Sequence, residues 1–194
     1  MLAHGAGAPQ QSAFIVGFAR GLAERGVDVL TFDFLYMEHG RRVPDRTEML
    51  EGCYRDAIET AREHFGRSGV FIGGKSMGGR IATHLAAADD ADALGINGVV
   101  ALGYPLHPPG KPQQLRAAHL SRIRVPMLIV QGERDPFGTP DELRPVLANV
   151  SGEVTLHVVG NGDHSLAPSR QKDSVATAYV EIQDAIVKWI RERR

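Results

Sequence analysis

Ser76 lies in a glycine-rich segment, Gly74-Lys75-Ser76-Met77-Gly78, that matches the pattern Gly-x-Ser-x-Gly. In this pattern a strained turn between a strand and a helix lifts the serine above a sheet, and the small flanking residues avoid clashes. A serine hydroxyl is protonated at neutral pH, so it needs a histidine base and a carboxylate that orients the base. The segment therefore predicts acyl transfer by a serine, and the rest of the chain must supply both partners.

Candidates for these partners follow later apolar runs. When a serine occupies such a turn, an acid and then a histidine are expected on loops beyond later strands. Asp135 and His164 have this order and this position. Glu133 and Asp163 are alternative acids, but Glu133 is nearer its strand and Asp163 adjoins the base itself. The competing histidines lie in expected helices, in a strand or in an early loop: His64, His84, His157 and His39.

Acyl transfer also needs backbone N–H groups that stabilise the developing oxyanion. One donor is expected from Met77, directly after the nucleophile. The other is expected from Ala6, within the small-residue turn His4-Gly5-Ala6-Gly7-Ala8-Pro9, where the backbone can approach a substrate.

A second pattern competes for the same serine. Gly69, Gly74, Lys75 and Ser76 match the phosphate-binding loop G-x-x-x-x-G-K-S. That loop must follow a strand, whereas its variable positions here, 70–73, are the only strand-like residues available. We therefore disfavour nucleotide binding. A structural alternative stays open, in which Ser76 fits a glycine-rich turn and has no catalytic role.

The elements that must position these residues alternate along the chain. Short apolar runs predict strands at Val27–Phe34, Val70–Ile72, Val99–Leu102, Pro126–Val130 and Val154–Val159. The last run alternates apolar and polar residues, which suits a strand at or near a sheet edge.

Helical stripes lie between these runs, and each presents one apolar face to a sheet. The stripes are Ile15, Phe18 and Leu22; then Leu50, Cys53, Ala57, Ala61 and Phe65; then Val175, Ala178, Ile182, Ala185, Ile186 and Trp189. A short helix is also possible at Gln113–Leu120. The alternation predicts an α/β fold with three α/β/α layers around a mostly parallel sheet of about six strands.

Length and composition limit the number of domains and the kinds of partner that the chain can have. The chain has 194 residues, of which 43% are hydrophobic, so a single domain spanning 1–194 is expected. Lys and Arg total 22 against 23 acidic residues, which disfavours nucleic-acid binding. No apolar run approaches the ~18 residues of a membrane span, and the start does not look like a secretory signal. We expect a cytoplasmic protein without a membrane partner, and the single cysteine, Cys53, forms no internal disulfide or thiolate metal cluster.

With these motifs in place, the chain resembles the α/β-hydrolases, close to the dienelactone-hydrolase-like group. The sequence of four segments is similar to that of a narrower bacterial branch, related to the testis-expressed and NSL-complex-subunit hydrolase-like proteins. The segments are residues 4–9, 74–80, 103–112 and 131–135. The resemblance implies the same triad of Ser76, Asp135 and His164.

The chain departs from that family in two respects. Relatives usually carry strands ahead of the His-Gly turn, so the leading N-terminal strands are expected to be missing, and the exposed edge makes a homodimer possible. Dienelactone hydrolases proper use a cysteine nucleophile where this chain has Ser76. Cys53 shares a helical stripe with Leu50 and Ala57, which indicates a core residue.

A substrate pocket is expected among the loops above the strand ends. Its predicted lining is small, apolar and aromatic: Gly5, Phe34, Tyr36, Tyr104, His107 and Phe137. The segment 105–124 is too short for a large cap domain, so the site is expected to be open. The sequence thus predicts a serine hydrolase acting on a small acyl substrate (ester, thioester or lactone) through an acyl-enzyme, with no metal and no cofactor. The alternative is a non-catalytic binding or scaffold protein with the same fold.

Overall fold

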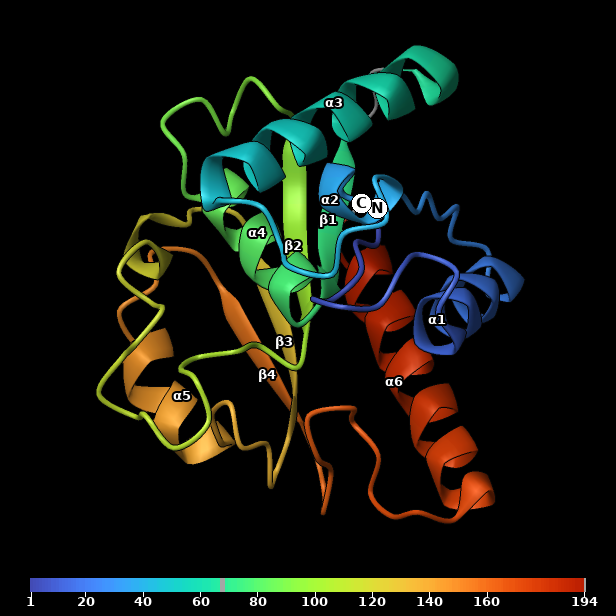
Figure 1. Ribbon diagram of the computed structural model, residues 1–194, viewed down its shortest axis with the longest axis vertical. Helices are drawn as coiled ribbons and strands as arrows, with labels where there is room; N and C mark the ends of the chain where they lie inside the picture. The colour runs from blue at the N-terminus through green and yellow to red at the C-terminus, as the bar shows by residue number, and fades with distance from the viewer. Residues whose placement is uncertain (67–68, 194) are drawn as a thin grey trace.

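The computed structural model describes residues 1–66 and 69–193, and at its centre is a parallel sheet (Figure 1). The sheet contains β1 (Val70–Lys75), β2 (Ile96–Leu102), β3 (Met127–Gly132) and β4 (Val154–Val159), in the order β1-β2-β3-β4. All three pairings are parallel. Every residue of β3 is buried, as expected for an apolar strand covered on both faces, whereas β4 lies at the sheet edge as its alternation predicts.

Helices cover both faces of the sheet (Figure 1). The helices are α1 (Ala13–Glu24), α2 (Leu35–Glu38), α3 (Thr47–Phe65), α4 (Met77–Ala86), α5 (Pro140–Leu147) and α6 (Lys172–Arg191), with a 3-10 turn, η1, at Leu120–Arg122. One core joins the sheet to α3, α4 and α5, and a second joins its opposite face to α1 and α6. The predicted α/β/α layers are therefore confirmed.

The number of strands differs from the expected six or so. The predicted strand at Val27–Phe34 is outside the sheet, and its backbone contact with the neighbouring segment is one hydrogen bond, from the Leu2 N–H to the Leu30 carbonyl at 2.9 Å. Its neighbour is only the short segment that ends at Ala3, which forms an isolated bridge with Gly74. A single bridge and a single hydrogen bond do not make the ladder of a strand pair.

The outer edge of β1 is closed in part by a side chain instead of a strand. The Tyr54 hydroxyl accepts a hydrogen bond from the Gly73 N–H at 2.9 Å and donates to the Gly73 carbonyl at 2.7 Å. Beyond this contact a cavity of about 790 Å³ lies between β1, residues 27–30 and the chain start at Met1.

The predicted face of α3 is wrong in part. Leu50, Tyr54 and Ile58 form its buried face, at a spacing of four residues, whereas Phe65 is 68% exposed. The bond between Tyr54 and β1 sets this rotation of the helix. The short helix expected at Gln113–Leu120 is also wrong, because that segment is irregular until η1 begins. Among the residues described, no helix is both long enough and apolar enough to span a bilayer.

Candidate active site

Ser76 occupies a sharp turn between β1, which ends at Lys75, and α4, which begins at Met77. Its backbone has φ 51° and ψ −113°, a conformation that side chains other than glycine rarely adopt. The turn is held by a hydrogen bond from the Ser76 N–H to the Leu102 carbonyl at 2.9 Å and by one from the Arg80 N–H to the Ser76 carbonyl at 3.0 Å. The strained conformation therefore has support from both β2 and α4.

The glycines on either side of Ser76 are required by close backbone packing. A Cβ on Gly74 would lie 2.5 Å from the Ala3 carbonyl oxygen, and a Cβ on Gly78 would lie 2.7 Å from the same atom. These distances are shorter than any real contact of a Cβ, so neither position accepts a side chain without movement of the backbone. The packing brings the start of the chain directly against the turn.

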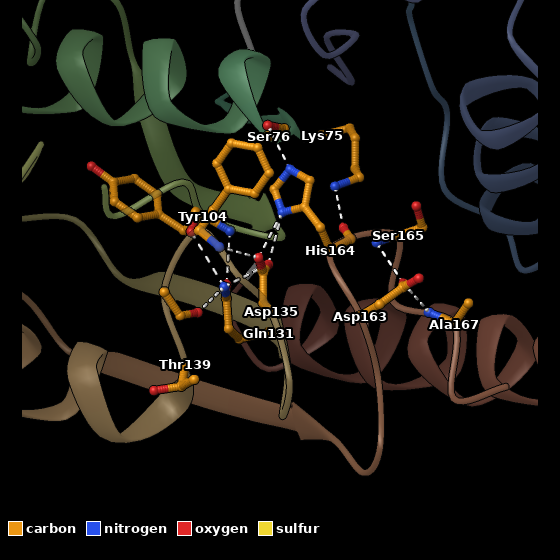
Figure 2. A network of polar contacts seen from close by, with 12 residues as sticks. Lys75, Ser76, Tyr104, Gln131, Asp135, Thr139, Asp163, His164, Ser165 and Ala167 are labelled. Atoms are coloured by element: carbon orange, nitrogen blue, oxygen red, sulfur yellow. Dashed lines mark hydrogen bonds and ion pairs between the residues drawn. The ribbon is translucent and has the colours of Figure 1, made fainter. Parts of the chain in front are cut away.

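The structure brings Ser76, His164 and Asp135 together (Figure 2). His164 Nε2 lies 2.9 Å from Ser76 Oγ, and His164 Nδ1 lies 2.8 Å and 3.0 Å from the two carboxylate oxygens of Asp135. A carboxylate can only accept, so Nδ1 carries the proton, and Nε2 is left to accept from the serine hydroxyl. This is the arrangement required for a histidine to act as a general base.

Asp135 is buried and its two oxygens are held by further donors. The Phe137 N–H donates to Oδ1 at 2.8 Å, and Gln131 Nε2 donates to Oδ2 at 2.9 Å. The Asp135 side chain is fully buried, whereas that of His164 is 21% exposed. The carboxylate therefore faces the imidazole from a fixed position, and the imidazole remains accessible.

Gln131 was missed by sequence reasoning. It lies in β3 with no exposed surface, and its amide also donates to the Gly138 carbonyl at 2.7 Å. Its Oε1 accepts from the Tyr104 N–H at 2.7 Å, so one side chain connects the segment after β2 with the acid loop after β3. The signal available in the sequence was a polar amide at the end of the apolar run Met127-Leu128-Ile129-Val130.

The two alternative acids have other partners. Glu133 Oε2 accepts from the Asn161 N–H at 2.7 Å. Asp163 Oδ1 accepts from the N–H groups of Ser165 at 2.7 Å and Ala167 at 3.2 Å, which closes the turn around His164 (Figure 2). Both carboxylates thus shape the loop that carries the histidine.

Gly5 and Phe137 are the two predicted substrate residues that lie at the triad. A Cβ on Gly5 would lie 3.6 Å from the Ser76 Cβ, so the turn at residues 4–9 borders the nucleophile. The Phe137 ring packs on the His164 imidazole, with ring centroids 4.1 Å apart.

The other predicted substrate residues are buried. Phe34, Tyr36 and Tyr104 have no exposed surface, and the Tyr104 hydroxyl donates to the Arg116 carbonyl at 2.6 Å. His107 is 5% exposed, and its Nε2 faces the Glu142 carboxylate at 3.3 Å. In this structure these four side chains support the surrounding loops and present almost no surface to a ligand. The sequence pattern could not distinguish an apolar pocket wall from an apolar core.

The two predicted oxyanion donors lie on either side of the nucleophile. Met77 is the first residue of α4, where a backbone N–H has no acceptor within the helix. Ala6 is exposed, and its N–H has no backbone acceptor among the residues that the structure describes.

His4 holds the turn that contains Ala6. It is fully buried, its Nδ1–H donates to the Gly5 carbonyl at 2.8 Å, and its Nε2 accepts from the Phe34 N–H at 3.1 Å. Burial lowers the pKa of His4, which keeps the ring in the neutral form that this pair of contacts requires. The sequence gives no local signal for this role, because a histidine before glycine is common in turns.

The competing phosphate-loop interpretation is wrong. Its variable positions, 70–73, lie in β1 and are paired with β2, so they form no loop. The Lys75 ammonium, which a phosphate loop would direct to a nucleotide, is bound to the carbonyl of His164 (Figure 2).

A parallel sheet with a serine at one strand-to-helix turn, and an acid and a histidine on loops after later strands, defines an α/β-hydrolase. The family model described as "Alpha/beta hydrolase domain" matches residues 1–191, and the chain belongs to this family. The resemblance found in the motifs is thereby confirmed.

Solved structures show the same fold at low sequence identity. An α/β serine hydrolase homologue from Coxiella burnetii is 16% identical with a TM-score of 0.74, over 96% of this chain and 82% of that one. Dienelactone hydrolase from Anabaena variabilis is 19% identical with a TM-score of 0.71, over 99% and 84%. An α/β serine hydrolase without a lid from Xanthomonas campestris is 18% identical with a TM-score of 0.71, over 98% and 81%.

Proposed function

We propose that this protein is a serine hydrolase that cleaves small carboxylic esters, thioesters or lactones. Ser76 Oγ attacks the carbonyl carbon while His164 Nε2 takes the hydroxyl proton, and Asp135 stabilises the imidazolium that forms. The histidine then returns the proton to the leaving group, which departs as the acyl-enzyme forms. Water, activated by the same histidine, releases the acid and regenerates Ser76.

The observation that carries this proposal is the continuous hydrogen-bonded path from Ser76 Oγ through His164 to the buried Asp135. A merely structural serine would not need a histidine that is oriented by a fixed carboxylate. The strained backbone of Ser76 also supports the proposal, because such strain is concentrated at functional sites.

Backbone N–H groups of Met77 and Ala6 are the proposed oxyanion donors. Removal of one such donor typically costs about 3 kcal/mol of transition-state stabilisation. Gly5 leaves the space beside Ser76 in which a substrate carbonyl could sit between the two donors.

A small substrate is favoured by the surroundings of the triad. The segment 105–119 contains no helix that could act as a lid, and the imidazole is partly exposed. The Xanthomonas relative is itself described as lacking a lid. Acyl groups of a few carbons fit such an open site better than long lipid chains do.

The test is intact-mass labelling with a fluorophosphonate, which reacts with activated serines. Wild-type protein should gain one probe mass at Ser76, whereas Ser76→Ala and His164→Ala should gain none. Ser121→Ala is the matched control, because Ser121 is an exposed serine outside the site. Folded wild-type protein that is not labelled would overturn the proposal and favour the binding or scaffold alternative.

Substrate class is then assigned by turnover. Acetyl, butyryl and octanoyl esters of p-nitrophenol and the matching thioesters of thiophenol are compared by kcat/KM, with chelator present throughout. We expect the acetyl and butyryl compounds to be preferred over the octanoyl ones.

A further inference from the structure

Lys75 is the residue directly before the nucleophile, and its side chain reaches the loop of the base (Figure 2). Its Nζ donates a hydrogen bond to the backbone carbonyl of His164 at 2.5 Å. This bond joins residues that are 89 positions apart in the chain. Apart from the contact between Ser76 and His164 themselves, it is the one side-chain hydrogen bond between residues 74–80 and 160–167 in the described structure.

The ammonium of Lys75 is in an unfavourable environment. Burial lowers the pKa of Lys75 to about 8, and no carboxylate of the described residues forms an ion pair with it. A buried charge without a carboxylate partner is destabilising, and a Met side chain would fill the same space without that cost. The buried ammonium therefore indicates that Lys75 has a role other than packing.

Space for the contact is provided by Gly103, at the turn after β2. A Cβ there would lie 2.8 Å from Lys75 Nζ, 2.9 Å from the His164 carbonyl oxygen and 3.5 Å from His164 Nδ1. Gly103 has φ +65°, which also favours glycine. The ammonium, the His164 carbonyl and the imidazole thus border one small space that only a glycine leaves open.

The other side-chain contacts of the loop that carries His164 come from residues just after β3 and from α6, where the Tyr179 hydroxyl donates to the Ser165 carbonyl at 2.9 Å. Glu133 and Arg134, both just after β3, bind the backbone of Asn161, and Asp163 closes the turn locally. These contacts fix the loop relative to β3. Among the described residues outside the triad, Lys75 is the one whose side chain forms a hydrogen bond that fixes the loop relative to the nucleophile.

We propose that Lys75 is a positioning residue, which holds the backbone of His164 at the distance from Ser76 that proton transfer requires. The inference rests on the proposed function, because it assigns Lys75 to the same reaction. Small misplacements of reacting groups are costly: about 1 Å can reduce the rate ~100-fold.

The test compares Lys75→Met, which removes the donor and the charge, with Lys75→Arg, which keeps both. Lys188→Met is the control, because Lys188 is exposed on α6. On p-nitrophenyl acetate, Lys75→Met should reduce kcat about 10- to 100-fold with little change in KM. Lys75→Arg should recover a large part of this loss, whereas Lys188→Met should match the wild type.

A structural role and a positioning role are separated by two further readouts. Because Met carries no charge to desolvate, Lys75→Met should keep the Tm close to that of the wild type. Loss of the contact should also shift the NMR resonance of the proton between His164 Nδ1 and Asp135, which is measured without any turnover. An unchanged kcat together with an unchanged Nδ1 proton resonance in Lys75→Met would overturn the inference.

If the proposed function itself is wrong, the experiments on the wild-type protein give a different result. A wild-type protein that neither turns over esters nor reacts with the fluorophosphonate contradicts the hydrolase proposal. The NMR resonance of the Nδ1 proton then decides alone: a shift in Lys75→Met retains the role of Lys75 at His164, and an unchanged resonance removes it. Loss of fold in Lys75→Met together with a wild-type profile in Lys75→Arg and Lys75→Leu would also overturn it.

Discussion

Three carboxylates lie near the base, and their surroundings give each a different task. Asp135 is buried and faces the His164 imidazole, Glu133 binds the backbone of the histidine loop, and Asp163 closes the turn that follows. A buried carboxylate with fixed donors orients a base better than an exposed one, because its position does not change as the charge develops.

This division of roles predicts which acid is needed for turnover. Asp135→Asn should reduce kcat about 10⁴-fold, because an amide at this position favours the wrong tautomer of His164. Glu133→Gln should keep most of the activity, since the amide oxygen can still accept from the Asn161 N–H. Ester hydrolysis by the two variants measures the difference. Equal losses in both would contradict the assignment of Asp135.

Gln131 should matter for both stability and rate. In Gln131→Met the Tyr104 N–H, the Gly138 carbonyl and one Asp135 oxygen lose their partner. We expect a loss of about 1 to 3 kcal/mol in the free energy of unfolding, and a lower kcat, because buried unpaired polar groups are costly. Urea unfolding and ester turnover measure these effects. Gln114→Met, at an exposed glutamine, should change neither quantity.

Sequence reasoning at the residue scale predicted the three side chains that the structure brings together and missed those that hold them in place. Ser76, Asp135 and His164 are recognisable because nucleophilic chemistry demands fixed residue types in a fixed chain order. Gln131, His4 and Lys75 act through contacts with residues 27, 30 and 89 positions away, respectively. Nothing in their local sequence specifies such partners.

At the element scale, the turn between β1 and α4 depends on the absence of side chains at its glycines. Gly78→Ala would place a Cβ 2.7 Å from the Ala3 carbonyl, so the helix or the chain start must move. We expect Gly78→Ala to lower the Tm and to abolish fluorophosphonate labelling. Gly52→Ala, inside α3 with open space at its Cβ, should instead stabilise the protein by up to about 1 kcal/mol. A labelled, stable Gly78→Ala protein would refute this account of the turn.

A second prediction concerns the contact between α4 and the segment before η1. His119 Nε2 lies 2.8 Å from Thr83 Oγ1, and its ring lies 3.9 Å from that of His84. Burial, with the positive charges of His84, Arg80 and Arg122, lowers the pKa of His119 from 6.5 to about 3. An unfolded chain therefore binds a proton below about pH 6.5 that the folded chain excludes until about pH 3. The free energy of unfolding must decrease as the pH falls through this window.

Replacement of His119 should reduce this acid sensitivity. His119→Gln keeps a donor for Thr83 but cannot titrate, so the midpoint of acid unfolding should shift to lower pH. Circular dichroism from pH 7 to pH 3 measures the midpoint. His39→Gln, at an exposed histidine, serves as control, and an identical shift there would show that the contact with Thr83 and His84 is not responsible.

For the whole molecule, the sheet is well held by β2 and β3 and weakly held beside β1. Residues 27–34 have no regular secondary structure and lie outside the sheet, and residues 27–30 border the cavity of about 790 Å³. Local opening requires less free energy where few backbone hydrogen bonds and apolar contacts are broken. Amide hydrogen exchange should therefore be faster at residues 28–33 than in β3. Equal protection of the two segments would contradict this difference in local stability.

The same region shows the limit of fold prediction from this sequence. Four of the five predicted strands pair as expected, because apolar β-branched runs bury well on both faces of a parallel sheet. Val27–Phe34 has the same composition, but pairing depends on a neighbour, and the chain start supplies only Ala3 as a bridge. Composition predicts that a segment is extended, whereas the partner determines whether it joins the sheet.

The strands lie in the sheet in the order in which they occur in the chain. Synthesis therefore produces each strand after the neighbour beside which it lies, and the turn with Ser76 is made before β2, β3 and β4. The histidine belongs to the loop after β4, the last strand to emerge. Under the proposed function, a growing chain contains its nucleophile before its base has been made, and we expect reactivity only once the loop after β4 is in place.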